Sequence, residues 1–232
     1  KVSAGADLSW SVVADGEQIL EPSVIRMRLS DGTVLGENLS RLKVFRHSVD
    51  ETLTALVPTK SRLVEDRYNE MKLRSGKDWA VETYYDHDGE VRAETSQWNF
   101  ASDAKCYWAN EKNPSYITHC EADFKELKLS EVDRQTYSYL PLSMKTEGGK
   151  RVVITEADLF DYPNLMLRAA QGRSLNAEFP HVIDAYEMRT DRDVTVTSLA
   201  DVIARTSGER NYPWRLMTIG SDRELLENSL AW

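Results

Sequence analysis

Short segments with alternating apolar and polar residues recur along most of this chain, and they restrict it to a fold built from strands. The segment 24–29 is an example, because its apolar residues Ile25, Met27 and Leu29 lie two positions apart. A period of two is that of a half-buried β-strand, whose successive side chains point to opposite faces. Similar segments follow at spacings of about 8–12 residues, which favours an all-β sandwich.

Turn residues divide the chain into predicted hairpins, and helical signals are sparse. Asp15-Gly16 and Gln171-Gly172 are typical of tight turns between antiparallel strands. A capping box at Ser221 predicts a short helix over 222–228, and the mixed pattern of 121–132 predicts an irregular or helical segment. The predicted strands cover 8–13, 18–20, 24–29, 33–35, 42–47, 53–57, 71–73, 79–85, 91–100, 152–154, 165–170, 174–179, 194–197 and 214–219.

Charge and composition exclude some classes of function. The 232 residues carry a formal net charge of −9, whereas a nucleic-acid partner requires a basic face. No apolar run approaches the ~20 residues that span a bilayer. The chain starts at Lys1 without a methionine, so we expect a trimmed start, and the lack of a signal peptide says little about export. Cys106 and Cys120 fit no zinc spacing and are expected to be small core residues, with a disulfide as the alternative.

Two groups of acidic residues could carry chemistry. His119, Glu121 and Asp123 alternate, so they would share one face of an extended chain, where carboxylates suit a hard cation such as Ca²⁺. A solvated sheet edge is the alternative for this group. Glu156, Asp158 and Asp161 follow the apolar segment 152–154 and could form a glycosidase-like carboxylate pair, or could cap a turn before a proline.

Tryptophans offer a third possibility. Trp98, Trp108 and Trp214 could stack on sugar rings, although tryptophans at strand positions more often belong to a core.

Several longer segments, in order along the chain, resemble one known family. These are "SVDETLTALVP" (48–58), "DRYNEMKL" (66–73), "ITEADLFDYPNLML" (154–167) and "RTSGERNYPWRLMTIGSDRELLENSLAW" (205–232). Together they resemble the N-terminal domain of glycoside hydrolase family 97, the α-glucosidase and α-galactosidase family of Bacteroides-type bacteria. The resemblance implies a β-super-sandwich like that of galactose mutarotase and one domain over residues 1–232. It places the catalytic carboxylates on a (β/α)₈ barrel of the same polypeptide, which this chain does not contain.

The resemblance also implies a role for individual residues. In "CEADFKELKLSEV", Glu121 stands ten residues before Glu131, in register with the glutamate through which the family's N-terminal domain binds an active-site Ca²⁺. Glu121 is therefore the candidate calcium ligand, and His119, Glu156 and Asp161 are candidates for facing the substrate or the barrel. The expected function is a non-catalytic wall of an exo-acting α-glycosidase that binds α-linked oligosaccharides, exported to the periplasm or the cell surface.

The sequence departs from the family pattern at one place, and two rival functions remain. After Asp88-Gly89 the family has a strand with an Ala-Tyr-Arg pattern, and roughly a dozen residues are missing here by comparison with usual strand-plus-turn spacing. The alternatives are a loop shortened in this protein, in which case the sheet lacks a strand, or a disordered piece dropped from the sequence. The rival functions are a free-standing carbohydrate-binding module and a mutarotase-like enzyme that uses His119 and Glu121 as acid and base.

Overall fold

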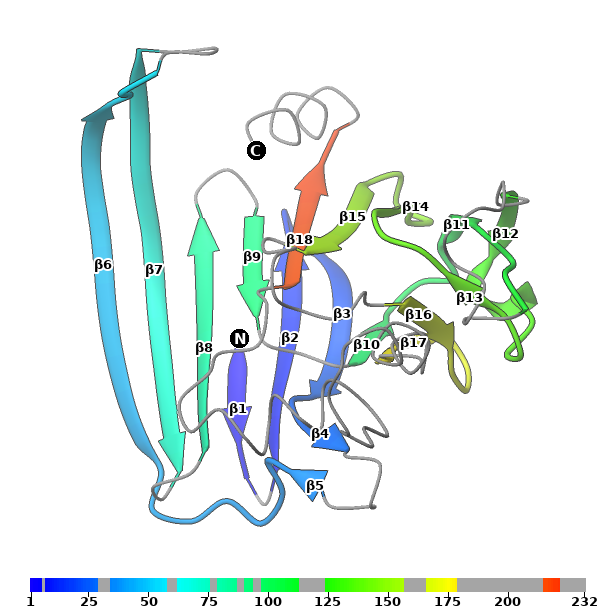
Figure 1. Cartoon of the computed structure of the whole chain (residues 1–232), viewed down its shortest axis with the longest axis horizontal. Coiled ribbons are helices and arrows are strands. Elements are labelled where there is room, and N and C mark those ends of the chain that lie inside the picture. Colours follow the sequence, from blue (N-terminus) through cyan, green and yellow to red (C-terminus); the bar gives the residue numbers. More distant parts are fainter. Residues whose placement is uncertain are drawn as a thin grey trace, which may run out of the picture.

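The fold is built almost entirely from antiparallel strands. A computed structural model describes residues 1–5, 7–28, 34–57, 62–75, 79–86, 90–93, 97–112, 124–156, 166–178 and 215–221. In this part of the chain the strands form two large sheets and a two-stranded ribbon, with a single turn of 3₁₀-helix, η2 (Leu129–Glu131) (Figure 1). The predicted all-β sandwich is therefore confirmed, while the predicted helix 222–228 and strand 194–197 lie outside the described residues.

The first sheet has seven strands, and every neighbouring pair is antiparallel. Their order across the sheet is β1 (Val2–Ala4), β2 (Leu8–Ala14), β3 (Glu17–Val24), β10 (Gln97–Phe100), β17 (Ser174–Glu178), β16 (Met166–Ala169) and β13 (Tyr137–Ser138).

The second sheet has nine strands, again with antiparallel neighbours throughout. Their order is β12 (Lys125–Lys128), β11 (Lys105–Trp108), β14 (Leu142–Lys145), β15 (Arg151–Glu156), β18 (Arg215–Gly220), β9 (Glu90–Ala93), β8 (Trp79–Asp86), β7 (Leu63–Ser75) and β6 (Lys43–Thr54). A separate ribbon pairs β4 (Met27–Arg28) with β5 (Val34–Leu35).

One continuous apolar core joins the two sheets. The first sheet contributes alternate residues of β2 and β10, such as Trp10 and Trp98, and the second contributes Trp108, Leu142 and Ile154. All five side chains are buried, and they belong to the same cluster. Alternation of inward and outward residues along each strand thus closes two sheets face to face, which is the packing of a β-sandwich.

Two predicted hairpins are confirmed in detail. Asp15 and Gly16 have φ values of 47° and 81° and connect β2 to β3, as a two-residue turn with positive φ at both positions requires. Gln171-Gly172 lies between β16 and β17, and Gly172 has a φ of 72°. Glycine is suited to these positions because it lacks the Cβ that penalises positive φ.

Two predicted strands are each divided in the structure. The segment 24–29 is not one strand, because the chain leaves the first sheet after Val24 and joins the separate ribbon at Met27. Ile25 between them is buried, and its N–H donates to the Leu8 carbonyl at 2.9 Å. The segment 91–100 is likewise divided into β9 and β10, which belong to different sheets. Alternation does not reveal a crossing between sheets, since both sheets bury every second residue.

Two other predictions are corrected. Segments 42–47 and 53–57 were expected as separate strands, but 43–54 is a single strand, β6, paired along its whole length with β7. Segment 121–132 was expected to be irregular or helical; its residues 125–128 form strand β12 instead, whereas 129–131 form the helical turn η2. The short alternation of β12 was hidden because its side chains are mostly exposed and polar on both faces.

The nine-stranded sheet is continuous where a family strand was expected to be missing. β8 and β9 pair directly, and β9 pairs on its other side with β18, so Ala93 lies opposite both Thr83 and Arg215. The turn residues 87–89 are outside the described part of the chain. Within the described strands, the short connection therefore leaves no unpaired edge at this place.

The β6–β7 hairpin is the longest pairing in the molecule and extends beyond the rest of the sheet (Figure 1). β8 ends at Asp86, opposite Tyr68, so the part of β7 from Leu63 to Arg67 pairs with β6 alone. The outer half of the hairpin is a two-stranded ribbon, and most of its side chains are exposed on both faces.

Candidate functional site

The two strands that precede the predicted site segments end at the same end of the nine-stranded sheet. β11 and β15 each pair antiparallel with β14, so they run in the same direction and end side by side. The chain that carries His119 and Glu121 leaves the end of β11, and the chain that carries Asp161 leaves the end of β15. Glu156 is the last residue of β15, opposite Arg215 at the start of β18.

Of the four predicted site residues, Glu156 alone lies in a described strand. The structure places its backbone at the end of β15. His119, Glu121 and Asp161 lie outside the described residues, as do Asp158 and Cys120. Among the described residues, no group of three or more His, Cys, Asp or Glu side chains is arranged to hold a metal ion. The described part of the chain instead shows how the site segments are anchored.

The segment that leads to Glu121 is fixed to the opposite sheet where it leaves β11. The indole Nε1 of Trp108 donates to Thr136 Oγ1 at 2.9 Å, and the Ala109 N–H donates to Ser138 Oγ at 3.0 Å. Glu111 and Tyr137 then exchange two backbone hydrogen bonds of 2.9 and 2.7 Å. Because buried donors and acceptors are costly to leave unpaired, this ladder fixes the path of the chain up to Glu111.

The segment returns into β12, whose first residue Lys125 lies opposite Trp108, and β12 is fixed at its far end, after Lys128. The Leu129 N–H donates to the Ala104 carbonyl at 3.0 Å, and the Leu129 side chain is buried. Ser130 donates twice to Asp103, from its N–H at 2.9 Å and from its Oγ at 2.7 Å. Glu131 accepts a hydrogen bond from the Lys128 N–H at 3.0 Å. The strand that follows the candidate calcium segment is therefore fixed at the end remote from that segment.

Asp103 is held in its ionised form by these contacts. Burial acts to raise the pKa of its carboxyl, but the two hydrogen bonds from Ser130, together with the nearby Lys128 and Arg173, outweigh burial and lower the pKa below its ordinary value of 3.8. A lowered pKa in the folded state means that the carboxylate contributes stability above its unfolded pKa. That contribution is lost as the pH falls through the folded pKa.

Replacing Asp103 with alanine is expected to lower the free energy of unfolding by about 1 kcal/mol, because a cap with two hydrogen bonds is removed from a partly exposed turn. Urea denaturation at pH 7 measures this difference, and the difference should shrink below about pH 4, where the carboxylate is being protonated. Asp103→Asn is the matched control, since its amide oxygen retains one acceptor. A loss that did not depend on pH would contradict the role of the charge.

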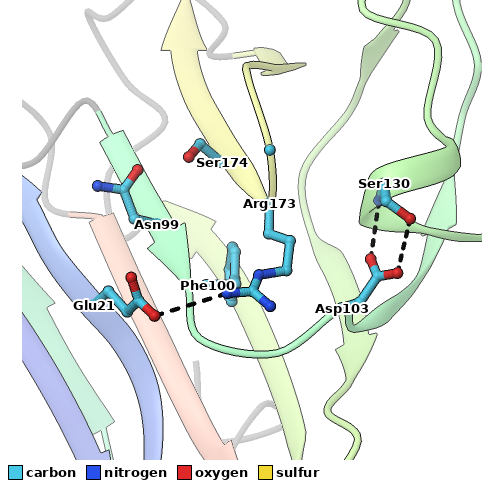
Figure 2. A pocket seen from close by; sticks show the side chains of 8 residues that line it. Glu21, Asn99, Phe100, Asp103, Ser130, Arg173 and Ser174 are labelled. Carbon is cyan, nitrogen blue, oxygen red and sulfur yellow. Dashed lines mark hydrogen bonds and ion pairs between the residues drawn. The ribbon is translucent and has the colours of Figure 1, made fainter.

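Asp103 and Ser130 also line an open groove beside β3, β10 and the start of β17, which the sequence did not suggest (Figure 2). Arg173 reaches across it to Glu21, with Nη2 and Oε1 3.7 Å apart. The carboxylates of Glu21 and Asp103 thus both have partners within the groove. Such an arrangement is typical of a structural polar cluster and differs from a pair of catalytic acid and base residues. The groove has a volume of about 610 Å³ and is lined by Glu21, Asn99, Phe100, Asp103, Ser130, Gly172, Arg173 and Ser174.

The tryptophans whose side chains are described belong to the core. Trp10, Trp98 and Trp108 are 4%, 1% and 0% exposed, so none of them offers a flat platform to a sugar. The prediction that strand tryptophans are core residues is confirmed for Trp98 and Trp108, while Trp214 lies outside the described residues. These three buried tryptophans therefore give no support to a free-standing carbohydrate-binding module.

Cys106 is a buried free thiol, as expected of a small core residue. Its Sγ donates to the Leu127 carbonyl at 3.4 Å, and burial raises its pKa to about 12. A thiol with this pKa is almost wholly protonated at neutral pH and reacts slowly, because the thiolate is the nucleophile.

Two sheets closed on one core, with acidic segments leaving one end of the larger sheet, define a β-super-sandwich domain. The chain belongs to the Glycosyl-hydrolase 97 N-terminal family, whose sequence profile it matches over residues 1–232. Membership in this family confirms the resemblance drawn from the sequence motifs.

Comparison with individual proteins agrees with this membership. The chain is 31% identical over 256 residues to a retaining alpha-galactosidase of Bacteroides thetaiotaomicron, and the match covers 100% of the chain but 38% of that protein. A glycoside hydrolase family 97 enzyme from Pseudoalteromonas sp. strain K8, solved with acarbose, superposes with a TM-score of 0.67 at 16% identity, over 97% of this chain and 35% of that one. A beta-arabinopyranosidase gives a TM-score of 0.59 at 15% identity, over 95% and 38% of the two chains. The chain therefore spans little more than a third of the length of the relatives it matches, and at these identities the solved structures show its fold.

Proposed function

We propose that this chain is the non-catalytic N-terminal part of an exo-acting α-glycosidase, with α-galactosides as the first candidate substrates and α-glucosides as the second. The observation that carries the proposal is the match of the whole chain to about a third of a retaining alpha-galactosidase. The remaining two-thirds of such a protein has ample length for a (β/α)₈ barrel, which typically takes ~250 residues and carries its active site on loops. The described strands include no alternating βα units, so we assign the hydrolytic carboxylates to that barrel.

The end of the nine-stranded sheet is the part that we assign to the sugar site. The segments that carry Glu121 and Asp161 leave this end, and Glu156 terminates a strand there. Carboxylate oxygens are the ligands that Ca²⁺ prefers, and the ion takes six to eight of them. The residues therefore suit a calcium ion in kind, with Glu121 as the ligand from this domain and further oxygens supplied by the barrel.

The chain's own residues would position that ligand and shape the site. The ladder at Trp108, Ala109 and Glu111 holds the start of the Glu121 segment, and the contact of Asp103 with Ser130 fixes the far end of β12, the strand that follows the segment. His119, Glu156 and Asp161 would face the substrate or the barrel from the same sheet end. A bound calcium ion would supply a Lewis acid and a template for the sugar. In the described residues no helix is long and apolar enough to cross a membrane, and we propose export to the periplasm or the cell surface, where oligosaccharides are met.

The test compares two forms of the protein on nitrophenyl α-galactoside and α-glucoside, with Ca²⁺ and with a chelator. We expect hydrolysis by the polypeptide extended past Trp232 and none by residues 1–232 alone, and the preferred glycoside identifies the substrate class. Activity of residues 1–232 alone would show that Glu121, Glu156 or Asp161 is catalytic and would overturn the proposed division of labour.

Replacing Glu121 with glutamine in the extended protein is expected to lower the affinity for calcium by about 10–100-fold or more, because a charged oxygen ligand is lost. The hydrolytic activity that remains in the presence of a chelator should fall by a similar factor. Calcium titration of activity measures the shift. Glu126→Gln is the matched control, since Glu126 lies nearby on β12, is exposed and pairs with Lys105 at 3.4 Å. An unchanged calcium requirement in Glu121→Gln would remove Glu121 from the metal site.

A further inference from the structure

The two faces of the β6–β7 hairpin differ in how their side chains are satisfied. In an antiparallel pair, residues directly opposite each other share a face. The face that contains Leu73, which is buried in the core, continues outward as polar pairs. On it Ser48 donates to Asn69 at 2.8 Å, and Arg67 Nε lies 2.8 Å from Asp50 Oδ1. We call this the inner face; its polar groups have partners within the hairpin and need no further contact.

The opposite side, which we call the outer face, is apolar mainly in its outer half, because nearer the core Lys72 lies opposite Phe45 and His47 pairs with Glu70. Its register pairs Val49 with Tyr68 and Leu53 with Val64, and it includes Phe45 nearer the core. Phe45, Leu53 and Val64 are 54%, 44% and 47% exposed. The apolar side chains of this outer half form a row that is typical of a contact surface.

An acidic pair interrupts the apolar row of the outer face. Glu51 and Asp66 lie directly opposite each other, between the pairs Val49–Tyr68 and Leu53–Val64. Like charges in directly opposite positions destabilise a pairing. Neither carboxylate has a basic partner among the described residues. The outer face thus fits a partner surface that is apolar around a basic side chain.

The hairpin needs such a partner for its own stability. Beyond Tyr68 the ribbon has only two strands, and an isolated two-stranded ribbon is marginal in water. Leu56 and Val57, at the tip, are 101% and 75% exposed. Burying these side chains would offset the cost of a projecting ribbon.

β18 ends toward the projecting part of the hairpin, at the opposite end of the sheet from Glu156. β18, β8 and β6 run the same way, because each is separated from the next by one antiparallel strand. The chain therefore leaves β18 at Ser221 toward the end of the sheet at which the hairpin projects (Figure 1). The related alpha-galactosidase has 62% of its length outside the match, so a large body of protein is available to lie there.

We propose that the outer face of the β6–β7 hairpin docks on the part of the same polypeptide that follows Trp232, with a basic side chain of that part set between Glu51 and Asp66. The inference rests on the proposed function in one respect, namely that a further domain follows. It adds the surface and the chemistry of the contact. The hairpin would hold the following domain at a place separate from the proposed calcium site.

The test measures the reactivity of single cysteines in the extended protein. Leu53→Cys reports the outer face, and Thr52→Cys, its exposed neighbour on the inner face, is the matched control. The background carries Cys120→Ser, and Cys106 reacts slowly because it is buried with a raised pKa. We expect Leu53→Cys to react with a maleimide at least about tenfold more slowly than Thr52→Cys, a difference that corresponds to ~1.4 kcal/mol of protection.

Partner identity is read from a second measurement. A benzophenone attached to the Leu53→Cys thiol should cross-link to residues beyond 232 within a monomer, as judged by mass spectrometry and light scattering. Equal reactivity of the two cysteines, or cross-links to residues 1–232 of a second copy, would overturn the proposal. Neither measurement uses substrate or calcium, so its result does not depend on glycosidase activity. An inactive extended protein can still show the contact, and an active one can still lack it.

Discussion

Replacing Trp108 with alanine is expected to lower the free energy of unfolding by about 3–5 kcal/mol. The indole is 0% exposed and lies in the core shared by the two sheets. Its removal leaves a cavity, and it also leaves Thr136 Oγ1 without its donor at 2.9 Å. For a domain of this size the loss corresponds to a fall in Tm of roughly 6–20 °C, which calorimetry of the extended protein measures.

Trp108→Phe separates the two contributions of this side chain. The phenyl ring fills most of the volume but donates no hydrogen bond, so we expect a smaller loss of about 1–3 kcal/mol. Because Trp108 ends the strand that leads to Glu121, Trp108→Ala should also weaken calcium dependence more than an equally destabilising change elsewhere in the core, such as Leu175→Ala in the seven-stranded sheet. Equal effects of the two variants on calcium dependence would argue against the anchoring role.

Replacing Thr218 with proline is the second change with a large expected effect, at least about 3 kcal/mol. Thr218 lies in β18, opposite Val153 on one side and Glu90 on the other. Proline cannot donate a hydrogen bond and is found essentially only on edge strands, so a central position tolerates it poorly. We expect loss of cooperative thermal unfolding and rapid proteolysis of the domain.

Thr218→Val is the control for this change, because valine keeps the N–H and the β-branched shape that strands favour. It should unfold within about 0.5–1 kcal/mol of the unchanged protein. A proline variant as stable as the valine variant would show that β18 is not a central strand in solution.

The sequence predicted the local pairings of this fold well. Period-two segments with a compact turn between them, such as β2–β3 across Asp15-Gly16, bury their apolar side by local rules that a sequence displays directly. The crossings between sheets were not predictable in this way. β9 and β10 stand a few residues apart in the chain but in different sheets, and β18 pairs with β9 across more than a hundred residues.

The candidate site residues were predictable from sequence motifs. The hydrogen bonds that fix the strands around them were not. Glu121, Glu156 and Asp161 came from acidic spacing and from the resemblance to a family. Asp103 carries no local signal, because its partner Ser130 is 27 residues away and the pair forms only when β11 and β12 are in register. The outer face of the hairpin was missed for another reason, since 42–47 and 53–57 were separated into two short strands and lost their common face.

The position of β18 in the sheet also determines how long two strand edges stay unpaired during synthesis. Until β18 arrives, the strands from β12 to β15 and those from β9 to β6 are two separate half-sheets, each with an open edge where β18 will insert. At 5–20 residues per second, a ribosome takes roughly 6–25 s to pass from β9 to β18. During that interval β9 presents an unpaired edge to neighbouring chains, and β15 does so once it has been made. A nascent chain of this family is thus most exposed to misassembly just before its last central strand emerges, and chaperones that cover strand edges should act in that window.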